Sequence, residues 1–289
     1  MAAAGNNIVR FTYTGADGEY IPDGVTHITI DKSCTFVRAN SFRGHRNIVE
    51  LVCHVYVEKI ERHAFNNCPS LRRVIMPGVK IVEPGAFNRC TALTDVQCGM
   101  LKIVAYEAFR HCESLGSINL PSATNVEQEA FDGCRALTDA KFGRCLERIE
   151  SGSFNNCQSL ERITIPLKDD IITNDPDDYL FQGCEQLKHV DLVERAELLE
   201  TIACLWRNDM NEKIDSINQI LPNTPSGEWD EEEEVWSGGR KARVIRGWIR
   251  SVLSEISHYK ASKEVVTALQ PLLPPDIAKN HVLPFLRFP

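Results

Sequence analysis

The sequence has no surplus of positive charge and no long hydrophobic run. Its 289 residues include 32 Lys and Arg against 40 Asp and Glu, a formal net charge of -8. Because nucleic-acid binding depends on basic side chains that neutralise phosphates, this balance argues against a nucleic-acid partner. No stretch approaches the roughly 18 apolar residues of a membrane span. The opening Met-Ala-Ala-Ala-Gly-Asn-Asn lacks the basic and apolar regions of a secretory signal, so we expect a cytoplasmic or otherwise intracellular protein.

The motifs of familiar catalytic and cofactor sites are absent as well. The sequence contains no Gly-x-Gly-x-x-Gly, no phosphate-binding lysine loop, no Gly-x-Ser-x-Gly and no His-Glu-x-x-His. The carboxylates between Asp169 and Asp178 lack the ordered spacing of a calcium loop, so a solvated loop is expected there. We therefore predict a protein that is not an enzyme and that uses no cofactor or metal.

The sequence does contain an internal repeat, the first feature to look for in any chain. A phenylalanine recurs mostly at steps of 22 or 23 residues, at Phe42, Phe65, Phe87, Phe109, Phe131, Phe154 and Phe181. Three residues after each come, in the same order, His45, Cys68, Cys90, Cys112, Cys134, Cys157 and Cys184. Several further apolar columns keep this phase. Columns locked to one period indicate a solenoid of stacked repeats.

The spacing within one repeat predicts its local structure. Two apolar columns lie two residues apart, which is the side-chain period of a β-strand. Segments such as 57–60 and 101–104 read as a second, shorter extended piece, and Ala-Phe-x-x-Cys-x-x-Leu reads as a tight corner. Each coil is therefore expected to run strand, turn, short strand, corner, with neighbouring coils about 4.8 Å apart.

The repeats also resemble a known family. Ala64-Phe-Asn-Asn-Cys-Pro-Ser-Leu-Arg-Arg-Val-Ile-Met-Pro77 and Ser153-Phe-Asn-Asn-Cys-Gln-Ser-Leu-Glu-Arg-Ile-Thr-Ile-Pro166 are similar to BspA-type leucine-rich repeats, a resemblance that covers about residues 37–192. Tyr13-Thr-Gly and Trp206-Arg-Asn-Asp-Met resemble segments of uncharacterised microalgal repeat proteins. The resemblance implies a protein-interaction solenoid, and some relatives are displayed on bacterial or protist surfaces.

The fold expected from these observations is α+β. It is a right-handed, mostly β solenoid of about seven 22–23-residue repeats, with an N-terminal β cap and a C-terminal helical hairpin. The cap occupies residues 1–36 and contains two expected strands; the solenoid occupies 37–193. Residues 194–289 show helical periodicity over 198–221 and 245–273 around an acidic linker at 222–240. The two helices either pair as a hairpin or dock separately on the end of the solenoid.

The eleven cysteines are the most unusual part of the composition. Six of them share one repeat phase, and no Cys-x-x-Cys pair offers the spacing of a metal site. Stacked side chains point in parallel, which is a poor start for disulfide geometry. We therefore predict a column of buried, reduced thiols that act as small apolar side chains, and hence a reducing compartment.

The expected binding surface is the outward face of the longer strands, because residues that alternate with core positions point away from the core. Its charges are of both signs, which suits a protein or peptide better than a polyanion; a plain solvated sheet is the competing interpretation. The residues predicted to contact the partner are Glu50, Arg73, Ile75, Asp95, Asp139, Lys141, Arg162 and His189.

The leading hypothesis is thus a non-catalytic interaction scaffold that binds a protein or peptide on the outward sheet face or at the helical end. Two alternatives stay open. Residues Leu273 to Leu286 resemble the opening of an F-box, which implies a ubiquitin-ligase substrate adaptor. Adhesion at the cell surface, as in some relatives, is the other alternative, and it would be expected to leave some cysteines oxidised.

Overall fold

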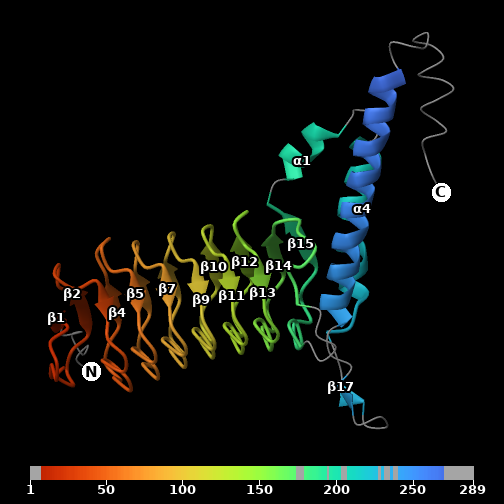
Figure 1. Cartoon of the computed structure of the whole chain (residues 1–289). Helices are drawn as coiled ribbons and strands as arrows, with labels where there is room; N and C mark the ends of the chain where they lie inside the picture. The colour runs from red at the N-terminus through yellow and green to blue at the C-terminus, as the bar shows by residue number, and fades with distance from the viewer. Residues whose placement is uncertain are drawn as a thin grey trace.

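The chain winds into a row of stacked coils, and one long helix stands across the C-terminal end of the row (Figure 1). This computed structural model describes residues 8–173, 179–193, 195–202, 207–226, 229–230, 235–236 and 240–269. Each complete coil contains one longer strand, one two-residue strand and a corner that leads into the next coil. The predicted order of strand, turn, short strand and corner is confirmed.

The longer strands pair in parallel along one side of the solenoid. They form two sheets, in the orders β1-β2-β4-β6-β8 and β10-β12-β14-β15. Their bounds are Arg10–Tyr13 (β1), His27–Ile30 (β2), Glu50–Val52 (β4), Arg73–Ile75 (β6), Asp95–Gln97 (β8), Ser117–Leu120 (β10), Asp139–Phe142 (β12), Arg162–Ile165 (β14) and His189–Leu192 (β15). In β12, Ala140 and Phe142 are buried while Lys141 is exposed, as the two-residue period of a strand requires.

The shorter strands form a second parallel sheet of six strands, in the order β13-β11-β9-β7-β5-β3. Their bounds are Phe36–Val37 (β3), Lys59–Ile60 (β5), Ile81–Val82 (β7), Ile103–Val104 (β9), Asn125–Val126 (β11) and Arg148–Ile149 (β13). In every one of them the second residue is buried. The interior therefore lies between the two sheets and the corners.

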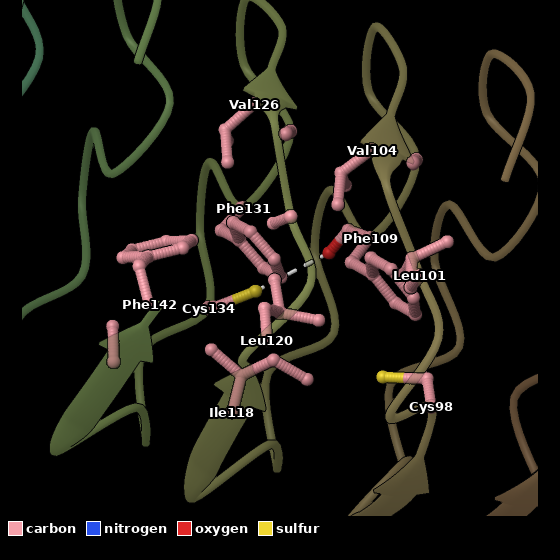
Figure 2. Close-up of a cluster of buried hydrophobic side chains, with 14 of the residues drawn as sticks. Cys98, Leu101, Val104, Phe109, Ile118, Leu120, Val126, Phe131, Cys134 and Phe142 are labelled. Atoms are coloured by element: carbon pink, nitrogen blue, oxygen red, sulfur yellow. Dashed lines mark hydrogen bonds between the residues drawn. The ribbon is translucent and has the colours of Figure 1, made fainter. Parts of the chain in front are cut away.

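The phenylalanine column is the centre of that interior. Successive rings from Phe42 to Phe181 stack with centroids 4.7 to 5.9 Å apart and planes inclined by 3° to 15°. Figure 2 shows Phe109 and Phe131 from two neighbouring coils in this arrangement. Tyr13 extends the column by one ring, 5.1 Å from Phe42. Stacked aromatic pairs contribute about 0.5–1.5 kcal/mol each beyond the area they bury.

The cysteine column lies beside the rings and is buried as predicted, but its thiols also make hydrogen bonds. Each Sγ donates to the carbonyl oxygen of the phenylalanine in the preceding coil, as Cys134 does to Phe109 at 3.2 Å (Figure 2). The six distances lie between 2.9 and 3.3 Å. No phenylalanine corner precedes His45, and this explains why the first repeat needs no thiol there.

The N-terminal segment, predicted as a β cap, continues the same parallel sheet. Strand β1 pairs with β2, and β2 pairs with β4, so that Arg10, His27 and Glu50 lie in register. The Tyr13 ring is buried, and its hydroxyl lies 2.9 Å from the hydroxyl of Ser41. The first two strands therefore share the packing pattern of the coils that follow them.

The C-terminal region is helical, but its first predicted helix is divided. The helical elements are Arg195–Thr201 (α1), Arg207–Asp215 (α2), Ile217–Ile220 (α3), a 3-10 turn at Leu221–Asn223 and Arg240–Leu269 (α4). A two-stranded antiparallel pair, Trp229–Asp230 (β16) with Val235–Trp236 (β17), precedes α4. Helices α2 and α3 pack against α4, and the indole nitrogen of Trp248 donates to the carbonyl of Lys213 at 3.1 Å.

These helices close the open end of the solenoid. The Lys241 side chain is 1% exposed, and its ammonium donates to the carbonyl oxygens of Cys184, Glu185 and Leu187 at 2.9, 3.1 and 3.0 Å. In an interior coil the carbonyl equivalent to that of Glu185, at Arg135, accepts a backbone N–H from the next coil. Lys241 therefore supplies the donor that a further coil would have supplied, which matters because unpaired buried carbonyls are costly.

Two further contacts hold the same end. The Asn218 side chain accepts a hydrogen bond from the backbone N–H of Val190, on the last strand, at 2.9 Å. Arg246 donates to the carbonyl of Thr173, and Arg250 lies 2.9 Å from the carboxylate of Asp169. Three basic side chains of α4, Lys241, Arg246 and Arg250, thus contact the solenoid and help to cover its open end.

Candidate interaction surfaces

The outward face of the longer strands carries the predicted partner-binding residues in two rows. In the first row, Arg73 lies between two acids, 3.6 Å from Glu50 and 3.1 Å from Asp95. The side chains of Arg73 and Asp95 are 47% and 46% exposed. Ile75, in the second row, is half-buried. These residues come from three adjacent strands, so the structure brings them together on one face.

The other four predicted residues lie on the second sheet of the same side. Lys141 pairs with Asp139 at 3.0 Å. Arg162 pairs with Asp191 at 2.5 Å, and His189 is directly opposite Arg162 in the strand register. The hydrogen-bonded sheet is divided between β8 and β10, so Asp95 and Asp139 belong to separate sheets. The face is thus a row of neutralised charge pairs rather than a patch of one sign.

A second polar surface runs along the corners, and the sequence analysis missed it. The residue after each column phenylalanine is polar or charged in all seven repeats: Arg43, Asn66, Asn88, Arg110, Asp132, Asn155 and Gln182. Two of these side chains are buried, Asn88 at 8% and Asp132 at 3% exposure. The uniform polarity of this column was visible in the repeat alignment and could have identified the surface.

The corners require left-handed backbone at two positions in most coils, two residues before and two residues after the phenylalanine. Glycine takes these positions at Gly44, Gly85, Gly133, Gly152 and Gly183, with φ between 63° and 77°. Residues with side chains take them with φ between 53° and 63°, at Asn40, His63, Asn67, Arg89, Glu107, His111, Glu129 and Asn156. A side chain in this conformation costs about 1–2 kcal/mol relative to glycine.

A cluster of charges occupies the middle of the corner surface. The Arg110 guanidinium contacts Glu107, and it lies 2.9 Å from both Glu129 and Asp132. Burial alone would raise the pKa of Glu107, but hydrogen bonds from Arg110 and Tyr106 outweigh burial and lower it. Glu107 is therefore ionised at neutral pH, and the cluster places three acidic side chains around one guanidinium.

Beside this cluster the corners of the first four coils form a groove of about 650 Å³. Its basic and imidazole side chains are Arg43, Arg89, His63 and His111, and Arg110 and Glu107 form its far end. Asn66, Asn67 and Asn88 supply amide groups. The groove therefore offers many hydrogen-bond donors and little apolar surface.

Several other predictions concern cysteines, metals and the tail. Burial raises the pKa of the Cys68, Cys53 and Cys98 thiols to about 12, which keeps them protonated at neutral pH. Among the described residues, no three His, Cys, Asp or Glu side chains gather as metal ligands would. Residues 174–178 of the acidic loop and the F-box-like segment 273–286 lie outside the described residues.

The comparisons with known proteins identify the class to which this repeat architecture belongs. The sequence matches the BspA type leucine-rich repeat region, in six copies, over residues 20–125 and 102–205. The chain therefore belongs to the BspA-type leucine-rich repeat family, whose repeats form generally non-catalytic scaffolds, and leucine-rich repeat folds generally bind proteins. None of the curated proteins compared with the chain matches it significantly.

Solved structures of leucine-rich repeat proteins are also similar to this chain. A leucine-rich repeat protein of T. pallidum is 22% identical, with a TM-score of 0.44, over 63% of this chain and 73% of that one. One from Bacteroides ovatus is 22% identical, with a TM-score of 0.41, over 60% of this chain and 53% of that one. The pneumococcal vaccine antigen PcpA is 14% identical, with a TM-score of 0.30, over 63% and 65% of the two chains.

The length and hydrophobicity of the helices bear on whether any of them could span a membrane. In the part of the chain that the structure describes, no helix combines the length and the apolar character needed to cross a bilayer.

Proposed function

We propose that this chain is a non-catalytic scaffold that binds a protein or peptide on the outward face of its longer strands. The observation that carries the proposal is the first outward row, in which one side chain per coil repeats in register along neighbouring strands. A partner with a complementary order of charges could exchange these intramolecular pairs for intermolecular ones.

The exposure of the row supports this use. Lys141 and Arg162 are 53% and 41% exposed, so their charged groups are accessible although each has a carboxylate partner. Exposed ion pairs contribute only about 0–1 kcal/mol to stability. Rearranging them on binding therefore costs little, and complementary charge governs specificity and the association rate more than affinity.

The helical end is less suited to be the main recognition surface. Lys241 and Arg246 of α4 contact the solenoid and are 1% and 7% exposed; Trp248, which contacts α2, is 6% exposed. They are already committed to contacts within the chain. Of the two surfaces considered from the sequence, the geometry favours the sheet face.

The proposal is tested by reversing one charge in the row. Tagged full-length protein carrying Arg73→Glu is compared with wild type by affinity purification and mass spectrometry. The matched control is Arg148→Glu, because Arg148 is 58% exposed on the opposite, short-strand sheet. We expect Arg73→Glu to lose the partner and Arg148→Glu to keep it. If Arg73→Glu and Arg162→Glu both recover every partner of the wild type, the sheet face is not the recognition surface.

We also propose that the protein works in a reducing, intracellular compartment. The support is the thiol column, in which each Sγ is engaged with a carbonyl and the ten described cysteines are free. Counting free thiols in denatured protein from its native source tests this. Eleven reactive thiols are expected, and substantial oxidation would point to export instead.

A further inference from the structure

The corner groove carries two guanidinium groups that the fold does not use. Arg43 and Arg89 both line it, both are exposed, and neither has an ion-pair partner among the described residues. The third arginine in the groove, Arg110, is by contrast surrounded by carboxylates. A guanidinium without a partner is suited to binding a carboxylate or a phosphate through two parallel hydrogen bonds.

Two of the groove residues, Arg89 and His111, have left-handed backbone conformations that are unfavourable for residues with side chains. Arg89 has φ of 63° and His111 has φ of 55°, in a column that other coils fill with glycine (Gly44, Gly133, Gly183) or asparagine (Asn67, Asn156). Glycine is the residue that best fits this conformation, whereas arginine has no local hydrogen bond to offset the strain. Left-handed residues with side chains concentrate at functional sites, where the strain serves the position of the side chain.

We propose that this groove is a second binding site, for an acidic peptide segment whose carboxylate or phosphate groups contact Arg43 and Arg89. The two arginines belong to the first and third corners, two coil steps or about 10 Å apart at about 4.8 Å per step. A peptide in the polyproline II conformation rises about 3.1 Å per residue with three residues per turn, so it covers that distance in about three residues and keeps residues i and i+3 on the same side. The segment therefore carries acidic residues at positions i and i+3.

The remaining lining groups fit such a segment. His63 and His111 provide imidazoles, and Asn66 and Asn67 provide amides, on the side of the groove that holds the unpaired arginines. These groups bond to peptide carbonyl and N–H groups without selecting a sequence. The carboxylates around Arg110 border the far end and repel a longer acidic run, which sets the direction in which the segment extends. The site goes beyond the sheet-face proposal and shares no residue with it.

The test is fluorescence anisotropy with the full-length protein and labelled peptides. One peptide carries glutamates at i and i+3, a second carries phosphoserines there, and a third carries glutamine and serine instead. Inorganic phosphate is the competitor that separates peptide recognition from binding of the bare anion. We expect one or both acidic peptides to bind, the uncharged one not to bind, and inorganic phosphate to compete only weakly.

The decisive variant is Arg89→Gly, because it restores the residue that other coils use. We expect it to weaken peptide binding about tenfold or more, as loss of a charge-assisted hydrogen bond does, and to leave the unfolding midpoint unchanged or higher. Arg43→Gln should weaken binding similarly. Arg72→Gln, which changes an exposed arginine that does not line the groove, should have no effect.

Several results would overturn the proposal. They are the absence of binding by either acidic peptide, equal binding by wild type and Arg89→Gly, equal competition by inorganic phosphate and peptide, or a lowered unfolding midpoint in Arg89→Gly. The sheet-face variant Arg73→Glu should retain peptide binding, so failure of the sheet-face proposal and failure of this one are distinguishable.

Discussion

Replacing Lys241 with methionine tests how the solenoid is closed at its C-terminal end. Methionine keeps a flexible apolar stem of similar length but has no ammonium group. The three carbonyl oxygens that Lys241 contacts, at 2.9, 3.1 and 3.0 Å, then lose this donor. The carbonyl of Cys184 keeps a hydrogen bond from the backbone N–H of Leu187. The carbonyls of Glu185 and Leu187 lose the hydrogen bond that the Lys241 ammonium donates to them.

The expected magnitude follows from two opposing effects. A buried polar group left without a partner costs about 1–3 kcal/mol, which applies in full to the carbonyl of Leu187 and less to that of Glu185, an exposed residue. Burial lowers the pKa of Lys241, which shows that the charged form pays a desolvation cost that methionine would relieve. Removing one partner from a buried charged contact is nevertheless destabilising in general. We expect a net loss of about 2–4 kcal/mol in the free energy of unfolding.

The chain offers two probes for this measurement. All four tryptophans, at positions 206, 229, 236 and 248, lie in the C-terminal third, so their fluorescence reports on the helical end. Far-UV circular dichroism reports on the whole chain. In urea, Lys241→Met should lower the midpoint seen by fluorescence, and it should lower the dichroism midpoint by the same amount only if the end and the solenoid unfold together.

The matched control is Lys260→Met, a change of the same chemistry at an exposed position of α4. It should leave both midpoints within error of the wild type. If Lys241→Met is as stable as the wild type, the three hydrogen bonds do not offset the burial of the ammonium group. The closure of the solenoid would then depend on apolar packing by α4 alone.

Three further predictions concern the coils themselves. In the native protein an alkylating reagent should modify exposed Cys145 and leave the six column thiols unreacted until the chain unfolds. Mass spectrometry of the labelled peptides checks this. Alkylation of the column cysteines in the folded protein would contradict their burial. Gly133→Ala should cost about 1–2 kcal/mol in denaturant unfolding, because φ is 72° and the added carbon would lie 2.4 Å from an imidazole of the preceding coil; Gly116→Ala, with open space around it, should be neutral. Because the pKa of Glu107 is lowered in the folded protein, this residue stabilises the fold above its unfolded pKa of about 4.3, and that contribution is lost as the pH falls through the folded pKa. Glu107→Gln should therefore reduce the drop in melting temperature between about pH 5 and 3. The exposed control Glu147→Gln should leave that drop unchanged.

The repeat itself was readable from the sequence, because a solenoid places equivalent residues in equivalent surroundings. Every coil must fill the same volume between the two sheets, so Phe65, Phe87 and Phe109 recur at nearly constant spacing and stack as the spacing indicates. The two-residue alternation in the longer strands likewise fixed which side chains face outward. The position of Arg73 beside Asp95 was predictable on that ground alone.

The interpretation of single residues within a column was less complete. The sequence identified Cys112 as a buried small side chain, but the partner of its thiol, the carbonyl of Phe87, depends on how the corner of one coil sits over the next. The left-handed backbone at Arg89 was also not readable, because arginine gives no sign of a conformation that glycine normally takes. The groove that Arg89 lines follows from that backbone.

The sequence by itself determined the repeat length, the strand period, the core columns and the outward rows, because each is a local pattern copied from coil to coil. Only the tertiary structure decided how the C-terminal end of the solenoid is closed after the last repeat. Lys241 lies 57 residues after Cys184, in a helix with no repeat phase, and nothing in the local pattern predicts that its ammonium meets the last corner. The carbonyls at the end of a stack need hydrogen-bond donors from a segment distant in the sequence, and that segment can be identified only in the folded chain.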